Sequence, residues 1–327
     1  MKYRNLGSSE LSLSTVSMGC WAIGGSWGKV SDEASRQALS RAVDLGINFF
    51  DTADVYGDGR SERLVGQLLK ERSETLYVAT KAGRRLDPHL TGGYNRENLS
   101  AFLERSLKNL GVERVDLLQL HCPPREVFYR PEVFGILDDL VQAGKLRHYG
   151  VSVEKVEEGL MALEYPGVRS IQIIFNPFRQ RPAERLLARA HAQGVGVLAR
   201  VPLASGLLTG KFSLQSTFES DDHRTFNRQG QAFDVGETFA GVPWQQGLQA
   251  VEQLRQHVPQ QFSLADLSLR WILDHEAVTC VIPGAKSGQQ VAENARASEL
   301  PSLDSSTTQA VDAIYRAMIA PHVHLRW

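Results

Sequence analysis

Short apolar runs alternate with amphipathic stretches along most of this chain. The runs are rich in Val, Ile, Leu and Phe and have the length of buried strands. Between and after them, apolar residues recur at the spacing of helices that pack on one face. We expect strands at 16–18, 48–51, 77–81, 117–121, 149–152, 171–174, 196–199 and 279–282. We expect helices at 32–45, 61–69, 96–110, 131–143, 156–163, 183–193, 264–274 and 288–298.

Strand and helix thus alternate eight times, which predicts an α/β fold, a (β/α)8 TIM barrel, with residues 1–327 as a single domain. Four glycines follow helical stretches, where a left-handed residue commonly ends a helix: Gly46, Gly111, Gly144 and Gly194. Outside the repeat we expect a hairpin near 7–8, a long loop at 212–243 after the seventh strand, and a C-terminal helix at 305–319. Since loops this long usually carry function, we interpret 212–243 as a flap over a ligand.

The bulk composition narrows the class of partner. Lys and Arg number 36 against 37 Asp and Glu, so no excess charge favours nucleic acid or an anionic membrane. The first residues contain no apolar signal-peptide core, and no run approaches the roughly 20 apolar residues of a membrane span. The three cysteines have no metal-binding or redox spacing. We therefore expect a cytoplasmic protein with a small-molecule partner and no bound metal.

Four polar residues lie at or just beyond the ends of three successive strands: Asp51, Tyr56, Lys81 and His121. In a parallel barrel these side chains emerge at the C-terminal mouth, where barrel enzymes carry their active sites. A phenol can protonate a carbonyl oxygen if a nearby ammonium lowers its pKa, and a carboxylate keeps that ammonium charged. An imidazole could hydrogen-bond the same oxygen. Each residue alone could equally cap a turn, decorate a loop or end a strand.

The motifs around these residues point to a known family. Residues 49–57 read FFDTADVYG, followed by Ser61-Glu62, by ATK at 79–81 and by VDLLQLH at 115–121. In combination they resemble the aldo-keto reductase superfamily, particularly its bacterial and potassium-channel-β-subunit-like branches. The resemblance extends from about Tyr3 to Leu300. It implies that Tyr56 is the general acid, that Lys81 and Asp51 tune it, and that His121 positions the substrate carbonyl.

The resemblance also implies an extended NADP(H) across the barrel mouth. A Rossmann domain is unlikely on the sequence itself, because the glycines at 19, 24 and 25 do not follow the dinucleotide-turn spacing. The implied cofactor-binding residues are Gly19, Trp21, Asp51, Ser152, Gln172, Arg200, Pro202, Leu203, Ser205, Gly206, Lys211, Arg228, Gly284, Lys286, Gln290, Glu293 and Asn294.

The chain departs from the family pattern in three places. Val153 replaces an asparagine that contacts the nicotinamide carboxamide, and Arg200 stands where many members have a ring-stacking aromatic residue. A guanidinium can also stack on a ring, so Arg200 stays in the expected site. Gly284 and Gln290 replace basic residues that hold the 2'-phosphate in some branches, which keeps NAD(H) open as an alternative. Lys286 and Ser287, at a helix N-terminus, are the remaining phosphate candidates, with Arg224 and Arg228 adding charge from the loop.

The substrate pocket is expected to include Trp21, Trp27, Tyr56, His121 and Phe128, with residues 90–94 and 322–327 as further candidates. No cationic cluster marks a carboxylate or phosphate substrate. The resemblance implies that the substrate is a small-molecule aldehyde or ketone. Two other classes stay open at this point. One is a cofactor-binding regulatory or redox-sensing subunit on the same fold, and the other is an unrelated barrel lyase or isomerase.

Overall fold

Eight parallel strands form the centre of the molecule. The computed structural model describes residues 1–25, 27–28 and 30–327. The strands pair in chain order, and isolated parallel bridges from Val16 to Val281 and from Gly19 to Gly284 join the first strand to the last. They are β3 (Met18–Gly19), β4 (Phe49–Asp51), β5 (Tyr77–Ala82), β6 (Val115–His121), β7 (Leu146–Ser152), β8 (Val168–Ile174), β9 (Gly196–Arg200) and β10 (Val278–Val281). The predicted α/β barrel is therefore confirmed.

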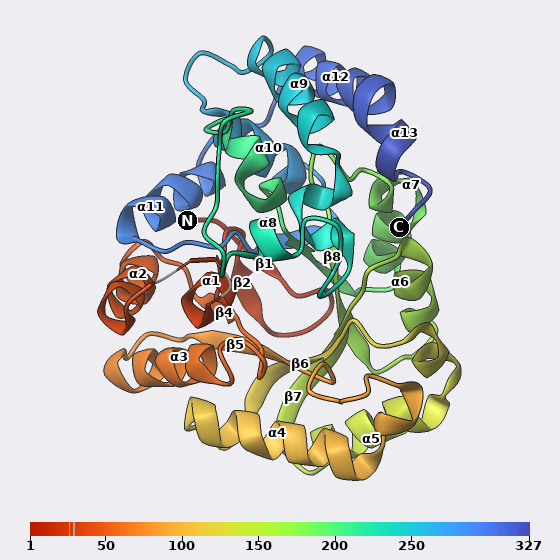
Figure 1. Cartoon of the computed structure of the whole chain (residues 1–327). Helices are drawn as coiled ribbons and strands as arrows, with labels where there is room; N and C mark the ends of the chain where they lie inside the picture. Colours follow the sequence, from red (N-terminus) through yellow and green to blue (C-terminus); the bar gives the residue numbers. More distant parts are fainter. Residues whose placement is uncertain (26, 29) are drawn as a thin grey trace.

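Helices surround the strands (Figure 1). Those of the repeat are α2 (Asp32–Asp44), α3 (Arg60–Glu71), α4 (Arg96–Leu110), α5 (Pro131–Gln142), α6 (Val156–Ala162), α7 (Pro182–Ala192), α10 (Leu264–Leu273) and α11 (Gly288–Ala295). Local sequence sets their ends. Asn95 caps α4 by accepting a hydrogen bond from the Asn98 backbone N–H, and Gly111 ends it with a left-handed φ of 67°. Gly46, Gly144 and Gly194 also have positive φ, as their positions predicted.

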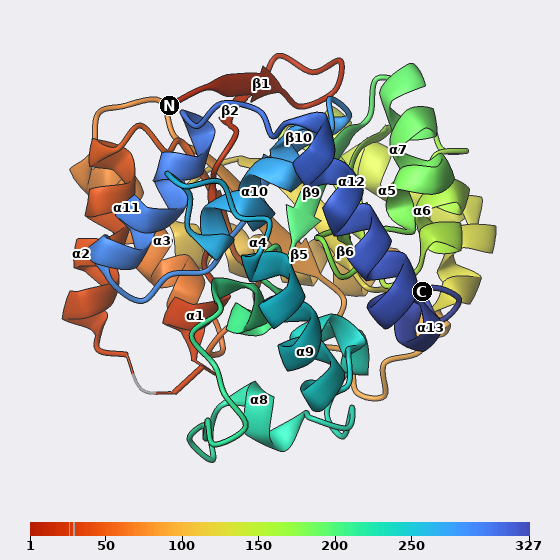
Figure 2. The same cartoon turned by 90° about the horizontal axis from the view of Figure 1, so that it is seen from above.

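The N-terminal end of the barrel is closed by a hairpin of β1 (Tyr3–Asn5) and β2 (Ser12–Ser14), which confirms the expected hairpin. Leu6, Leu11 and Leu13 of this hairpin pack against the inward-facing residues of the strands, including Phe49 and Leu117. Figure 2 shows the hairpin and helix α8 (His223–Phe226) at opposite ends of the molecule. The floor of the barrel is thus filled with apolar side chains, which leaves the opposite mouth for chemistry.

The C-terminal segment and one helix differ from a simple barrel. The expected C-terminal helix is present as α12 (Ser305–Ile314), continued by a π-helical turn (Tyr315–Ile319) and α13 (Ala320–Val323). Helix α9 (Trp244–Arg255) was not predicted. Its buried face contains Gly247 and Ala250 beside Val251 and Leu254. Because two of these residues are small, the helical spacing of apolar residues is hard to recognise in the sequence. The one-turn helix α1 (Trp21–Gly24) was also not predicted.

Two further findings concern the expectations from composition. Within the described residues, no helix combines the length and the apolar content that a membrane crossing requires. All three cysteines are free, and Cys20 and Cys280 are buried.

Candidate active site

A cavity of about 660 Å³ opens at the C-terminal mouth of the barrel. Its walls come from the ends of the strands, from the segment that follows β9 and from the start of α11. Asp51, Tyr56 and His121 line it. Phe212, Arg224 and Glu237 line it too, so the long loop after β9 forms part of the cavity wall.

The four polar residues predicted from the strand ends, Asp51, Tyr56, Lys81 and His121, lie together, and we call them the tetrad. Asp51 and His121 are the last residues of β4 and β6, and Lys81 lies in β5. The Lys81 Nζ lies 2.5 Å from Asp51 Oδ1, donates to the Thr52 carbonyl at 2.8 Å, and lies 5.1 Å from the centroid of the Tyr56 ring. The Tyr56 and His121 rings meet edge to face, with centroids 5.9 Å apart.

Two side-chain amides hold the Asp51 carboxylate in place. Gln172 donates to Asp51 Oδ2 at 2.7 Å and Gln119 donates to the same oxygen at 3.1 Å. Ser152 in turn donates to the Gln172 side-chain oxygen at 3.3 Å. Sequence reasoning missed Gln119, although a signal was present. It lies two residues before His121 in β6, so both side chains point to the barrel interior.

Burial dominates the titration of these groups. Burial raises the pKa of Tyr56 and the charge of Lys81 opposes it, so the net shift is opposite to the lowering that the sequence suggested. Burial works against the charge of Lys81, but Asp51 and Tyr56 outweigh it and raise the pKa of Lys81. Burial, followed by Arg84 and Lys81, holds the pKa of His121 well below its usual range. At neutral pH the site therefore contains a phenol, an ammonium and a neutral imidazole.

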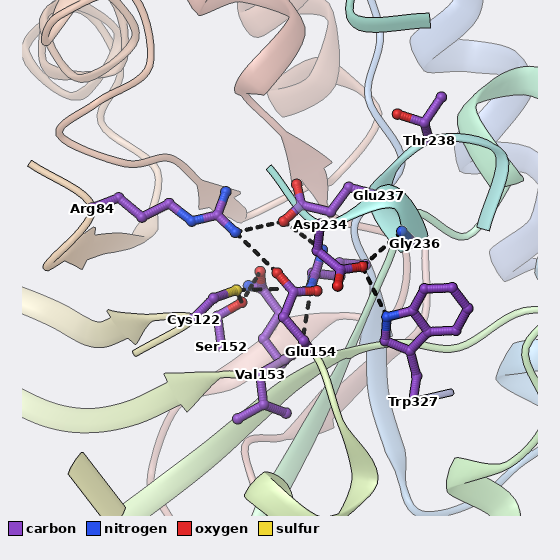
Figure 3. Close-up of polar contacts among 12 residues, drawn as sticks. Arg84, Cys122, Ser152, Val153, Glu154, Asp234, Gly236, Glu237, Thr238 and Trp327 are labelled. Carbon is purple, nitrogen blue, oxygen red and sulfur yellow. Dashed lines mark hydrogen bonds and ion pairs between the residues drawn. The ribbon is translucent and has the colours of Figure 1, made fainter. Parts of the chain in front are cut away.

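Four charged side chains form a closed ring beside these residues. Arg84, from beyond β5, pairs with Glu154 at 3.0 Å and with Glu237 at 2.6 Å. Arg200, the last residue of β9, pairs with Glu154 at 2.9 Å and with Glu237 at 3.5 Å. Figure 3 shows Arg84, Glu154 and Glu237 converging from three different elements. We call these four residues the charge ring.

The charge ring changes the picture of Arg200. Its guanidinium also donates to the Val153 carbonyl at 3.1 Å, so it is fixed against the cavity wall while its Nε has no hydrogen-bond partner among the described residues. Ligand atoms of Cys122, Glu154 and Glu237 lie within 4.8 Å of one another, a spacing that would suit a cation. However, both carboxylates are already paired with arginine. Arg84, Glu154 and Glu237 were not predicted, although Arg84 and Glu154 directly follow strand ends.

The residues expected to hold a cofactor mostly line the same cavity. They are Gly19, Trp21, Asp51, Ser152, Gln172, Arg200, Pro202, Leu203, Ser205, Gly206, Lys211, Gly284, Lys286, Gln290, Glu293 and Asn294. Ser287 caps α11 by accepting from the Gln290 backbone N–H, so Lys286 lies at a helix start as expected. Ser263, Ala265, Asp266 and Arg296 also line the cavity and were missed. They come from the start of α10 and the end of α11, which no motif had connected.

Arg228 differs from this group. Its guanidinium packs over the rings of Phe218, Phe239 and Trp244 at 5.0–5.9 Å, and it is not among the cavity-lining residues. It therefore stabilises the fold of the loop after β9 in this structure. Arg224, the other arginine of the loop, does line the cavity.

Some of the aromatic residues expected in the substrate pocket line the cavity, and one does not. Trp21 and Trp27 line the cavity with ring centroids 5.5 Å apart, and Trp21 stacks on Tyr56 at 6.0 Å. The loop residue His223 packs on both tryptophans, with centroids at 4.8 and 4.3 Å. The loop thus covers the tryptophan side of the mouth.

Phe128 lies elsewhere. It is 3% exposed, packs in the apolar core with its ring centroid 6.4 Å from that of Phe134, and does not line the cavity. The two segments considered as further candidates also contribute no cavity-lining residue. Tyr94 is fully buried and Trp327 packs over Arg179 at 4.0 Å. Fewer of the expected residues therefore line the substrate pocket than the sequence suggested.

The fold and the site together define a barrel oxidoreductase site, and comparison with known proteins agrees. Residues 15–316 match the Aldo/keto reductase family, and the chain belongs to this family. The chain is 31% identical to the aldo-keto reductase YhdN of Bacillus subtilis (strain 168) over 299 residues. These residues make up 89% of this chain and 87% of the relative.

Two further relatives agree with the branches that the sequence suggested. A putative voltage-gated potassium channel subunit beta from Schizosaccharomyces pombe (strain 972 / ATCC 24843) is 31% identical over 336 residues, or 95% of this chain and 92% of the relative. The holo form of aldo-keto reductase AKR11C1 from Bacillus halodurans superposes with a TM-score of 0.78 at 26% identity, over 99% of both chains.

Proposed function

We propose that this chain reduces an aldehyde or ketone to an alcohol, with NADP(H) as the hydride source and Tyr56 as the proton donor. The observation that carries the proposal is the convergence of Asp51, Tyr56 and His121 on one cavity at the barrel mouth, with the buried Lys81 paired to Asp51 beside the Tyr56 ring. Family membership supports an oxidoreductase acting on carbonyl compounds.

Tyr56 is suited to be a proton donor because burial raises its pKa and keeps the phenol protonated at neutral pH. Proton donation leaves a phenolate, and the adjacent Lys81 stabilises that negative charge. Asp51 keeps Lys81 charged despite its burial. The ammonium thus stabilises the product of the proton transfer rather than making the free phenol acidic.

His121 has a different role in the proposal. Its pKa lies well below the usual range, so the imidazole is neutral and one ring nitrogen carries a hydrogen. Facing Tyr56 at the cavity wall, it can donate a hydrogen bond to the carbonyl oxygen and orient it for protonation. A neutral ring also leaves the tyrosine as the proton source.

The cavity residues fit a nicotinamide cofactor. When bound, the reduced cofactor supplies a hydride to the carbonyl carbon. Ser152 and Gln172 offer a hydroxyl and an amide beside the tetrad, and the buried Arg200 Nε is a donor that no residue described in the structure satisfies. At the opposite end of the cavity, the N-terminus of α11 and Lys286 offer a phosphate site.

A preference for NADP(H) over NAD(H) rests on Lys286. Several cationic residues line that end of the cavity, but Lys211, Arg224 and Arg296 each lie within 4 Å of a carboxylate. Among the described residues, Lys286 has no such carboxylate partner, and its Nζ contacts the Trp27 carbonyl. An ammonium at a helix start without a carboxylate partner among the described residues supports recognition of a 2'-phosphate.

The test is reduction of a panel of aldehydes and ketones, followed by loss of NADPH absorbance and repeated with NADH. We expect turnover with NADPH that depends on Tyr56. Absence of turnover with every carbonyl compound, together with unchanged NADPH fluorescence on titration, would count against both the reaction and the cofactor.

The second candidate is a cofactor-binding regulatory subunit with little turnover. The similarity to a putative potassium channel subunit favours it. NADPH binding with micromolar affinity but no reduction of any panel member would support this candidate, since binding and catalysis would then be separated.

A further inference from the structure

The charge ring adjoins the position at which a carbonyl substrate would react. Arg200 and Glu237 line the cavity together with Tyr56 and His121, while Arg84 and Glu154 complete the ring. The charges of Glu237 and Arg84 act on the titration of Tyr56, and Arg84 and Arg200 act on that of His121. A charged group on the substrate would therefore interact with the ring.

Two arginines at such a position would ordinarily make an anion site, because guanidinium groups bind carboxylates and phosphates through paired hydrogen bonds. In this chain each arginine is instead paired with both glutamates. The four charges sum to zero when both carboxylates are ionised. An anionic substrate entering here would lose its hydration and find no uncompensated cation in the ring.

Glu237 is the member that sets this balance. Burial alone would raise its pKa, but Arg84 and Arg200 outweigh burial and lower the pKa to about 2, so Glu237 stays ionised. Burial raises the pKa of Glu154 to about 7, which makes it the less firmly charged partner near neutrality. Glu237 is also the carboxylate that reaches the cavity wall.

We propose that Glu237 is a specificity-determining residue that cancels the anion-binding capacity of Arg84 and Arg200, so that the enzyme takes uncharged carbonyl compounds and rejects carboxylated or phosphorylated ones. This inference rests on the proposed carbonyl reduction and adds the substrate class to it. The ring also joins the loop after β9 to the barrel, so the test has to separate charge selection from a structural role.

A matched pair of substrates isolates the charge. 4-Oxobutanoate and its methyl ester share a skeleton and an aldehyde and differ in one negative charge. The ratio of their kcat/KM values, acid over ester, is measured at pH 8, where Glu154 is mostly ionised as well. For the wild-type chain we expect a ratio well below one.

Glu237→Gln keeps the shape of the side chain and leaves the ring with one positive charge. We expect the acid-to-ester ratio to rise on the order of tenfold to a hundredfold, mainly through KM for the acid. Glu219→Gln is the matched control, since it makes the same change at an exposed position of the same loop and should leave the ratio unchanged. Arg84→Met combined with Glu237→Gln removes one charge of each sign, so the ratio should return close to that of wild type.

Each outcome decides between the hypotheses. A wild-type chain that reduces neither compound, nor any of the panel, contradicts the proposed function itself. Reduction of the ester with a ratio that Glu237→Gln leaves unchanged contradicts the specificity inference alone, as does a double variant that behaves like Glu237→Gln. If Glu237→Gln does not fold, Arg84→Met alone tests the same idea with the opposite sign. It leaves a net negative ring and should lower the ratio below that of wild type, and an unchanged or higher ratio would refute the inference.

Discussion

Replacing Lys81 with methionine tests the ion pair at the centre of the site. Lys81 and Asp51 are 1% and 3% exposed, and their charged atoms lie 2.5 Å apart. Methionine fills nearly the same volume as the lysine stem, so the change creates little cavity. It removes a charge, however, and leaves the buried Asp51 carboxylate with the amides of Gln119 and Gln172 as its side-chain partners among the residues that the structure describes.

Breaking a buried pair from one side typically costs about 3–5 kcal/mol, because the remaining charge is uncompensated. We expect Lys81→Met to lower the free energy of unfolding by this amount, measured by urea denaturation at pH 7. The double variant with Asp51→Asn removes both charges and should cost at least about 2 kcal/mol less than the sum of the single changes. The exposed Lys108→Met is the control and should cost little.

Turnover of Lys81→Met should also fall by at least about tenfold, because Tyr56 loses the cation that stabilises its phenolate. A loss of stability below about 1 kcal/mol, or additive single changes, would refute the account of a tightly coupled pair. Folded Lys81→Met protein with full activity would refute the assignment of Lys81 to the proton-transfer site.

Three further predictions follow from single side chains. Tyr56→Phe should bind NADPH almost normally in a fluorescence titration and lose about 100- to 10,000-fold in carbonyl reduction, and retention of more than a tenth of the turnover would exclude Tyr56 as the acid. Lys286→Ala should weaken NADPH binding by about 1–3 kcal/mol and leave NADH binding nearly unchanged, whereas equal effects on both cofactors would show that Lys286 does not discriminate. Asp54 is fully buried, neither of its carboxylate oxygens has a hydrogen-bond partner in the described part of the chain, and burial raises its pKa to about 7. The folded chain therefore keeps a proton that the unfolded chain loses above about pH 4, so the unfolding free energy should fall between pH 4 and pH 7 by up to about 4 kcal/mol. Asp54→Asn should flatten this part of the urea-denaturation pH profile, and an equal slope in both proteins would contradict the assignment.

The barrel could be predicted because its determinants are local. Strands such as β6 and β8 are buried over most of their length, so Val, Leu and Ile make up more than half of each and the strand can be recognised without knowing its partner. Helices such as α4 carry their own start and stop signals in Asn95 and Gly111. Helix α9 escaped prediction because the residues on its buried face are small, and burial of Gly247 and Ala250 depends on what packs over them.

The tetrad could also be predicted, since the polar ends of neighbouring parallel strands meet at one edge whatever the loops do. Its electrostatics could not. The sequence places Lys81 near Tyr56 and suggests a lowered phenol pKa. Because the site is deep, desolvation of Tyr56 outweighs the effect of Lys81 and the phenol pKa is raised instead. The depth of the site is set by Trp21, which stacks on Tyr56, and by the loop after β9, whose His223 packs on Trp21, and neither has a local pattern.

The charge ring could not be predicted from the sequence, because its members are far apart along the chain. Arg84 and Glu154 are 70 positions apart, and Arg84 and Glu237 are 153 apart, yet both pairs are in direct contact. Arg200 alone suggests a cation on the nicotinamide, which would disfavour its oxidised form, but two carboxylates offset that charge in the fold. The effect of a charged residue at a strand end therefore depends on partners that only the closed barrel and its loop bring together, so a substitution at Glu237 should alter substrate choice without touching any motif residue.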